Sequence, residues 1–249
     1  MNARSSKKNL PAVREGADED PGAVAKLLSH VLERSTRLQG PAVTAYVNRL
    51  REGRPDASPA DIVTALEKHY LAAVMASGAA VGSAAAFPGI GTLAAMGAVA
   101  GETLVFLEAT AVFALAVAEV HGVPADHRER RRALVLAVLV GEDSKHAVAD
   151  LLGTGRTSGA WMSDGAATLP LPAVAQLNNR LLRYFVKRYT LKRGAMAFGK
   201  LLPVGIGAVV GGVGNRMMGK RIIENARLAF GNPPARWPST LHMLPSAQP

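Results

Sequence analysis

The sequence predicts an all-α fold, a compact multi-helix bundle that contains Gly/Ala-rich helical hairpins. Of its 249 residues, 49% are hydrophobic and 19% are charged, a balance typical of a globular chain with a buried core. Aromatic residues make up only 5%, so the apolar mass is mainly Ala, Val, Leu and Gly, which favours close helix packing over strands. Apolar residues also recur at spacings of three and four in several segments, as in amphipathic helices.

We expect three regions along the chain. Residues 1–20 are rich in charged and polar residues and contain no apolar run, which predicts a disordered tail and no secretory signal. Residues 21–231 form a single helical domain, and the proline-rich residues 232–249 form an extended tail with Trp237 packed onto the body. The chain has no cysteine, which excludes disulfides and thiolate metal sites, and we expect a cytoplasmic protein.

The first helices are predicted from their start and stop signals. Asp20 and Pro21 begin a helix that Gly40 ends, and Pro41 begins a shorter one with the sequence PAVTAYVNRLRE. A capping pattern at Ser58-Pro59-Ala60-Asp61 then begins the next helix.

An uncharged stretch from Leu71 to Gly101 predicts a helical hairpin whose second limb runs from Thr92 to Gly122. At about 1.5 Å per residue, the limb from Leu71 to Ala86 is roughly 24 Å long, short of the roughly 30 Å hydrocarbon core of a bilayer. Acidic residues in the second limb add a further cost to burial in lipid. We therefore expect a peripheral body, with shallow insertion of the hairpin as the alternative.

The second half of the domain begins with a helix over 126–141 that has a basic opening and an apolar, buried remainder. A short helix over 142–153 and a loop over 153–169 follow. An amphipathic, basic helix over 173–193 leads into a second small-residue segment, and a final helix through IIENARLAF stops at Gly231.

Glycine in a helix costs about 1 kcal/mol relative to alanine unless it permits a close backbone approach. Gly78 and Gly82, like Gly207 and Gly211, are four residues apart and share a helical face, which predicts close helix contacts. The two segments FPGIGT and LPVGIGA supply most of the structural glycines and prolines. These structural positions are Pro88, Gly89, Gly91, Pro203, Gly205, Gly207, Gly211, Gly212, Gly214 and Asn215.

Sites for catalysis are weakly indicated. The glycines lack the G-x-G-x-x-G spacing and no Walker lysine follows them, so we expect no nucleotide cofactor. Asp143, His146 and Asp150 share a helical face, but Asp143 is better explained as a helix cap, so we expect no metal. The candidates are Glu102, Glu108 and Glu119 on one apolar helix, where the last two are eleven apart and return to nearly the same face. One interpretation is a lipid-handling or hydrolytic enzyme with a carboxylate pocket; the other is hydrogen bonding to basic neighbours.

Positive charge is the strongest interaction signal. A net charge of +10 favours polyanions, meaning an anionic membrane surface or, as a second alternative, nucleic acid. Aromatic residues lie between the cations of the 180–193 helix, which favours binding at a lipid interface. The sequence shows no helix-turn-helix spacing that would favour binding to DNA. The expected lipid-binding cations are Arg180, Arg183, Lys187, Arg188, Lys192, Arg193, Arg216, Lys220 and Arg221.

Residues 60–235 resemble the EcsC family of bacterial proteins in its actinobacterial form. The segments that carry the resemblance are AAAFPGIGTLAAMGAVAGETLVF, RRRALVLAVLVGE and, most specifically, LPVGIGAVVGGVGN. The resemblance implies a mostly helical protein of the cytoplasmic side, named for its association with an ABC-transporter operon and linked to membranes. Together with the positive charge, it predicts anionic membrane lipids and a membrane protein or transporter as partners, and it supplies no catalytic residues.

Overall fold

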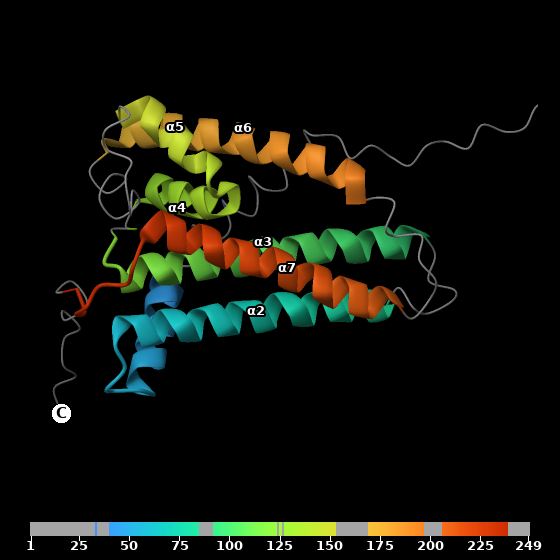
Figure 1. Cartoon of the computed structure of the whole chain (residues 1–249), viewed down its shortest axis with the longest axis horizontal. Helices are drawn as coiled ribbons and strands as arrows, with labels where there is room; N and C mark the ends of the chain where they lie inside the picture. Colours follow the sequence, from blue (N-terminus) through green and yellow to red (C-terminus); the bar gives the residue numbers. More distant parts are fainter. Residues whose placement is uncertain are drawn as a thin grey trace, which may run out of the picture.

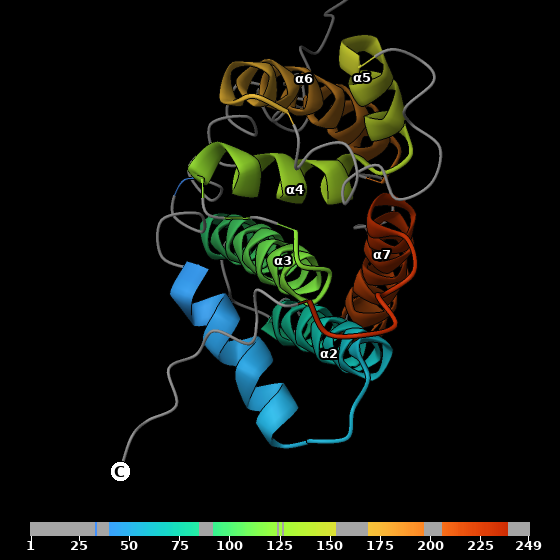
Figure 2. The same cartoon turned by 90° about the vertical axis from the view of Figure 1, so that its left-hand side faces the viewer.

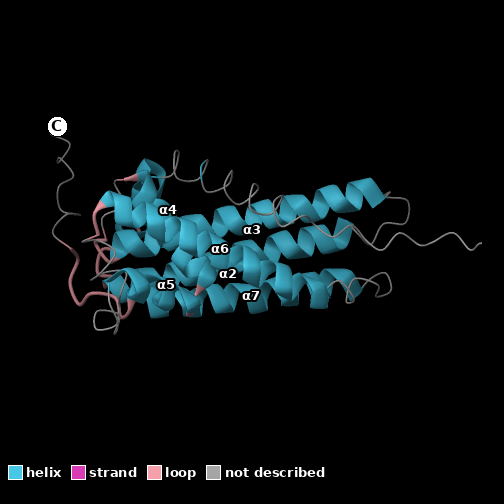
Figure 3. Cartoon of the chain, turned by 90° about the horizontal axis from the view of Figure 1, so that it is seen from above, coloured by secondary structure: helices cyan, strands magenta, loops and turns pink. Residues whose placement is uncertain are grey.

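A computed structural model describes residues 33, 40–84, 92–123, 125, 127–152, 169–196 and 206–238, and it confirms the all-α prediction. Helices and turns account for these residues, and none of them forms a strand (Figure 3). Residues 40–52 are helical and precede the longer elements. Those elements are α2 Pro59–Ala84, α3 Thr92–Val120, α4 Arg128–Val140, α5 Asp143–Leu152, α6 Leu171–Met196 and α7 Ile206–Phe230.

Three long helices, α2, α3 and α7, run side by side along the long axis of the molecule (Figure 1). Seen end-on, they form a triangle, and α4 crosses above α3 and α7 (Figure 2). Helices α5 and α6 cover the other side of α4, so α4 lies in the middle of the fold. The predicted hairpin limbs, now α2 and α3, are packed neighbours.

Local signals set several helix ends as predicted. At the start of α2, the Ser58 amide donates to Asp61 Oδ2 (2.9 Å) and the Asp61 amide donates to Ser58 Oγ (3.3 Å), a reciprocal capping box. The Ser58 hydroxyl also donates to Asp61 Oδ2 (2.6 Å), and this bond, together with the one from the Ser58 amide, holds the pKa of the Asp61 carboxyl below its usual range. At the end of α7, Gly231 has φ +74° and its amide donates to the carbonyl of Arg227 (2.9 Å).

Helix α4 is buried on most sides, as its apolar sequence predicts. Every residue from Ala133 to Val140 is buried. Gly141 ends the helix with φ +76°, and a Cβ atom there would collide with the side chain of Asn225 on α7. Asn225 uses this space to donate from Nδ2 to the carbonyl of Val138 (2.9 Å). The end of α4 is therefore tied to α7.

The closest approach of α7 to α2 occurs at Gly219. A Cβ atom on Gly219 would lie 3.0 Å from both Leu71 Cδ1 and Val74 Cγ2, so the missing side chain leaves room for two apolar side chains of α2. The glycines that the sequence predicts to allow such contacts are Gly78, Gly82, Gly207 and Gly211. All four lie in helices, the first two in α2 and the others in α7; Gly78 is buried, and the surroundings of the other three lie outside the described part of the chain.

Two predicted boundaries differ from the structure. The second small-residue segment and the final helix are one continuous helix, α7, because Gly212 and Gly214 are accommodated within it. The basic helix predicted over 173–193 begins two residues earlier, at Leu171. The remaining motif positions, and the helix predicted over 21–39 apart from Glu33, lie outside the described residues; these motif positions are Pro88, Gly89, Gly91, Pro203 and Gly205.

The start of the C-terminal tail is packed onto the body. Trp237 donates from Nε1 to the carbonyl of Ala57 (3.3 Å), and the guanidinium carbon of Arg51 lies 4.1 Å from the centre of the indole ring. Pro238 occupies the space beside Gly122, whose φ of +68° turns the chain after α3. Trp237 packs as the sequence predicts.

We expect Gly219→Leu to lower the free energy of unfolding by about 1–3 kcal/mol, since the new side chain has to displace Leu71 and Val74. Gly214 provides the control, because a Cβ atom there meets nothing within 4 Å. Gly214→Ala should raise stability by up to about 1 kcal/mol through helix propensity. Urea unfolding measures both, and equal effects at the two glycines would contradict the close-packing explanation.

Candidate functional site

The outward side of α7 carries apolar and basic residues together. We call the exposed residues Val213, Arg216, Met217, Lys220, Arg221 and Leu228 the outer face of α7. Their spacing by three and four places them on one side of the helix. The exposed fractions of Val213, Met217 and Leu228 are 52%, 69% and 46%, which are high for large apolar side chains.

Helix α7 is fixed to α2 by two polar contacts as well as by Gly219. Asn215 is buried and donates from Nδ2 to the carbonyl of Val74 (3.0 Å) and to Glu102 Oε1 (2.9 Å), so it joins α7 to α2 and α3. Further along, Arg227 binds Glu67 with two hydrogen bonds of 2.7 and 2.6 Å. The hydrogen bonds to Glu67 raise the pKa of Arg227. Together, these contacts determine which residues of α7 face outward.

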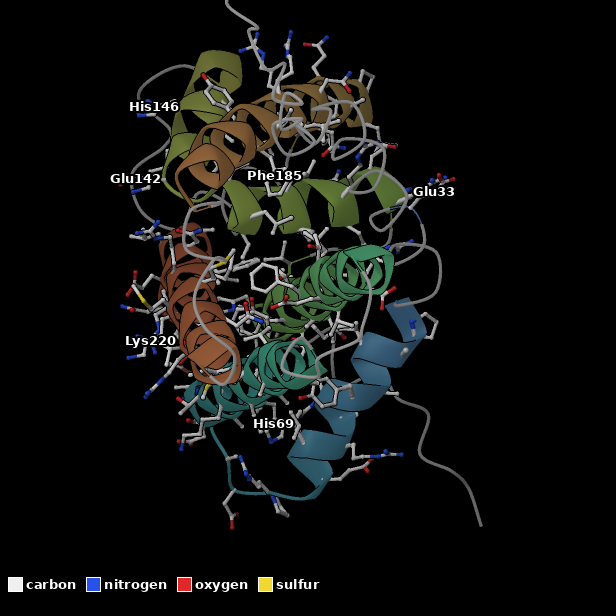
Figure 4. The ribbon with its side chains drawn as sticks, turned by 90° about the vertical axis from the view of Figure 1, so that its right-hand side faces the viewer. Glu33, His69, Glu142, His146, Phe185 and Lys220 are labelled. Carbon is white, nitrogen blue, oxygen red and sulfur yellow. The ribbon has the colours of Figure 1, made fainter. Side chains whose placement is uncertain are left out.

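The second basic surface lies on α6. Arg183 and Tyr184 are exposed, whereas Leu181 is fully buried, so the helix is amphipathic as predicted. Arg180 is partly buried. Figure 4 shows Phe185 turned from α6 towards the interior, where it packs against the core. Four further cations predicted on or after this helix have side chains outside the described part of the chain; they are Lys187, Arg188, Lys192 and Arg193.

The arginines at the start of α4 have structural contacts instead. Arg128 forms an ion pair with Glu33 (2.8 Å). Arg130 donates to the carbonyl of Leu169 (3.1 Å), and Arg131 donates to the carbonyl of Ala125 (2.7 Å). This basic cluster therefore serves to hold neighbouring loops against α4.

The three candidate acids on α3 have separate surroundings. Glu102 accepts from Asn215, whereas Glu119 accepts from Thr44 Oγ1 (3.1 Å), which lies in the helical residues 40–52. Glu108 is partly buried between them. At about 1.5 Å per residue, Glu108 and Glu119 are roughly 16 Å apart along the helix. Their carboxylates are therefore too far apart to bind one small substrate molecule together. The described contacts bring no two of these carboxylates together.

Two titratable side chains on or beside α3, Tyr70 and His121, have pKa values shifted by burial. Tyr70 stacks on Phe113 and shares a hydrogen bond of 2.9 Å with Thr110, and burial raises the pKa of its phenol. Burial lowers the pKa of His121, whose Nδ1 donates to the carbonyl of Val117 (2.8 Å). Both groups are therefore neutral near pH 7. Among the described residues, no cluster of His, Cys, Asp and Glu is suited to a metal ion.

One described segment, Gly101–Val120 in α3, is long and apolar enough to cross a bilayer, with a mean hydropathy of 1.9. Inside the protein, 56% of this segment is buried. A core helix of a globular protein has the same length and composition, so the segment alone does not distinguish a membrane span from a core helix.

Comparison with known proteins adds no site residues. The chain matches no protein-family model, no curated protein and no solved structure. The outer face of α7 and the Asn215 junction therefore have to be interpreted from their geometry. Sequence patterns identified the cations and Asn215, but the exposed Val213, Met217 and Leu228 were missed because glycine-rich runs predict contact on every side.

We expect Asn215→Ala to lower the free energy of unfolding by about 1–3 kcal/mol, because the Val74 carbonyl and the Glu102 carboxylate lose their donor. Glu102→Gln should cost less in the Asn215→Ala background than in the native chain, and urea unfolding of the four proteins measures this coupling. Glu108→Gln is the control and should be additive with Asn215→Ala. Additivity of the Glu102 and Asn215 changes would show that their hydrogen bond contributes nothing.

Proposed function

We propose that this protein is a non-enzymatic, peripheral membrane protein of the cytoplasmic side that binds anionic lipid head groups, alone or beside a membrane protein. One observation carries the proposal. Exposed apolar side chains stand among exposed cations on α6 and α7, as in Tyr184 beside Arg183 and Met217 beside Arg216. The resemblance to the EcsC family supports the same assignment, since that family is linked to membranes.

The cations supply attraction to an anionic surface. The chain has a net charge of +10, and each Lys or Arg close to an anionic leaflet contributes about 1 kcal/mol of binding free energy. The exposed cations on these two helices that the structure describes are Arg183, Arg216, Lys220 and Arg221. Within the described part of the chain, none of the four forms an ion pair that would reduce this attraction.

The apolar residues favour lipid over nucleic acid. The phosphate backbone of a nucleic acid offers charge and hydrogen-bond acceptors. It offers no apolar surface against which Val213, Met217 and Leu228 could be buried. The boundary between head groups and acyl chains accommodates both kinds of residue, because cations remain among the phosphates while apolar side chains enter the lipid. Nucleic-acid binding is therefore the weaker proposal.

Peripheral binding fits better than spanning. Helix α3 is the candidate span, but its buried Thr110 is hydrogen-bonded to Tyr70 on α2, and Glu102 is bound by Asn215 on α7. Crossing a bilayer would break these contacts and place carboxylates in hydrocarbon. Binding from the surface requires no such loss.

We expect the protein to co-sediment with vesicles of phosphatidylglycerol and phosphatidylcholine, and not with vesicles of phosphatidylcholine alone. Raising the salt concentration should weaken the binding, because salt screens exposed charges. Arg183→Glu combined with Lys220→Glu should weaken it about thirtyfold or more, since two lost cations alone account for about 2 kcal/mol.

The matched control is Arg49→Glu combined with Lys68→Glu, which makes the same change in net charge at two exposed positions that belong to neither α6 nor α7. Circular dichroism establishes that both variants are folded. Equal loss of binding in the two variants would assign the effect to net charge alone, and equal binding of the native protein to both vesicle types would exclude the proposed function.

A further inference from the structure

We infer that the outer face of α7 is the surface that contacts the membrane, and that α7 lies parallel to the bilayer plane while the bundle stays folded. This inference rests on the proposed lipid binding and adds its location and mode. The ligand is an anionic bilayer surface, and the contact residues are Val213, Arg216, Met217, Lys220, Arg221 and Leu228.

The geometry of the face suits a flat surface. From Val213 to Leu228 the helix rises about 22 Å, so the exposed apolar residues are distributed over four turns rather than at one tip. Arg216 and Lys220 flank Met217 on one side of this line, and Arg221 lies on the other. Figure 4 shows Lys220 on the outside of α7, pointing away from the bundle. Cations on both sides of an apolar line are the arrangement expected for an interfacial helix.

The packing of α7 makes this face part of the folded state. Asn215 and Gly219 are buried on the inner side and hold α7 to α2 and α3, and the exposed Arg227, at the edge of the outer face, binds Glu67 of α2. The helix is then unable to turn its apolar side inward without losing these contacts. A rigid bundle already presents the face, so lipid binding needs no opening of the α2 and α3 hairpin.

Charge complementarity selects a bilayer over a second copy of the chain. In a two-fold dimer through this face, two surfaces would meet that each carry three cations, Arg216, Lys220 and Arg221, and one acid, Glu224, and such an excess of like charge repels. Protein interfaces are also depleted of Lys in their centres. An anionic leaflet satisfies the cations and the apolar residues at once.

Glu224 is the one acid on this side of α7, one turn after Lys220. An anion at that position opposes binding to an anionic leaflet. Neutralising Glu224 therefore distinguishes a lipid-contact role of this face from a structural role. Loss of the negative charge strengthens binding if the face contacts lipid, whereas damage to the structure weakens it.

The cysteine-free chain allows a single label at a chosen position. We expect a nitrobenzoxadiazole label on Met217→Cys to shift to shorter emission wavelengths when vesicles of phosphatidylglycerol and phosphatidylcholine are added. The matched label on Arg49→Cys should not shift, because the helical residues 40–52 lie across α2 and α3 from α7 (Figure 2). Co-sedimentation of both labelled proteins is measured in parallel.

These outcomes separate the inference from the proposed function. If both labelled proteins sediment with vesicles and the Met217→Cys label does not shift, lipid binding stands and the outer face of α7 is excluded. If neither sediments, the proposed function fails as well. A shift without vesicles that grows with protein concentration would assign the face to a second copy and overturn the lipid assignment.

A second variant tests the face by gain of binding. Glu224→Gln should strengthen binding to the same anionic vesicles about fivefold, the effect of one added unit of positive charge near the leaflet. The control is Glu52→Gln, an exposed position in the helical residues 40–52, which should change binding little. Unchanged or weaker binding of Glu224→Gln would overturn the inference.

Discussion

The close packing of α7 against α2 is the constraint on which the rest of the structure depends. Three α7 positions contact α2 in antiparallel order: Asn215 with Val74, Gly219 with Leu71, and Arg227 with Glu67. Hydrogen bonds at both ends and a missing side chain in the middle fix the rotation of α7 about its own axis. Because that rotation is fixed, the residues that face solvent are fixed with it.

The core repeats this combination of small residues and satisfied polar groups. Buried Thr110 and Tyr70 are hydrogen-bonded to each other, and Asn225 binds a carbonyl at the end of α4. A buried polar group without a partner costs more than a hydrogen bond gains, so these pairs favour one arrangement of the helices over others. The apolar length of α3 is consistent with a place inside the bundle, since Glu102, Thr110 and Glu119 have hydrogen-bond partners in neighbouring helices.

Local chemistry made much of the fold predictable. The capping pattern at Ser58 and Asp61, the stop at Gly231 and the buried apolar run of α4 each depend on residues close together in sequence. The bond between Asn215 and Glu102 joins positions 113 apart, and no local pattern specifies it. The same limit explains why the sequence did not single out Gly219: small residues show that close packing is possible, and only tertiary structure decides which one meets a neighbour.

The candidate site consists of exposed α7 side chains that point away from the packed bundle. The cations of α4 bind carbonyls and an acid within the protein, but those of the outer face of α7 have no such role, and the adjacent apolar residues lie in water. The exposure of Met217 among these cations supports the proposed partner, a surface that accepts apolar and cationic groups together. One amphipathic face supplies only modest binding energy, which makes reversible attachment, controlled by lipid charge and salt, the mode that this surface favours.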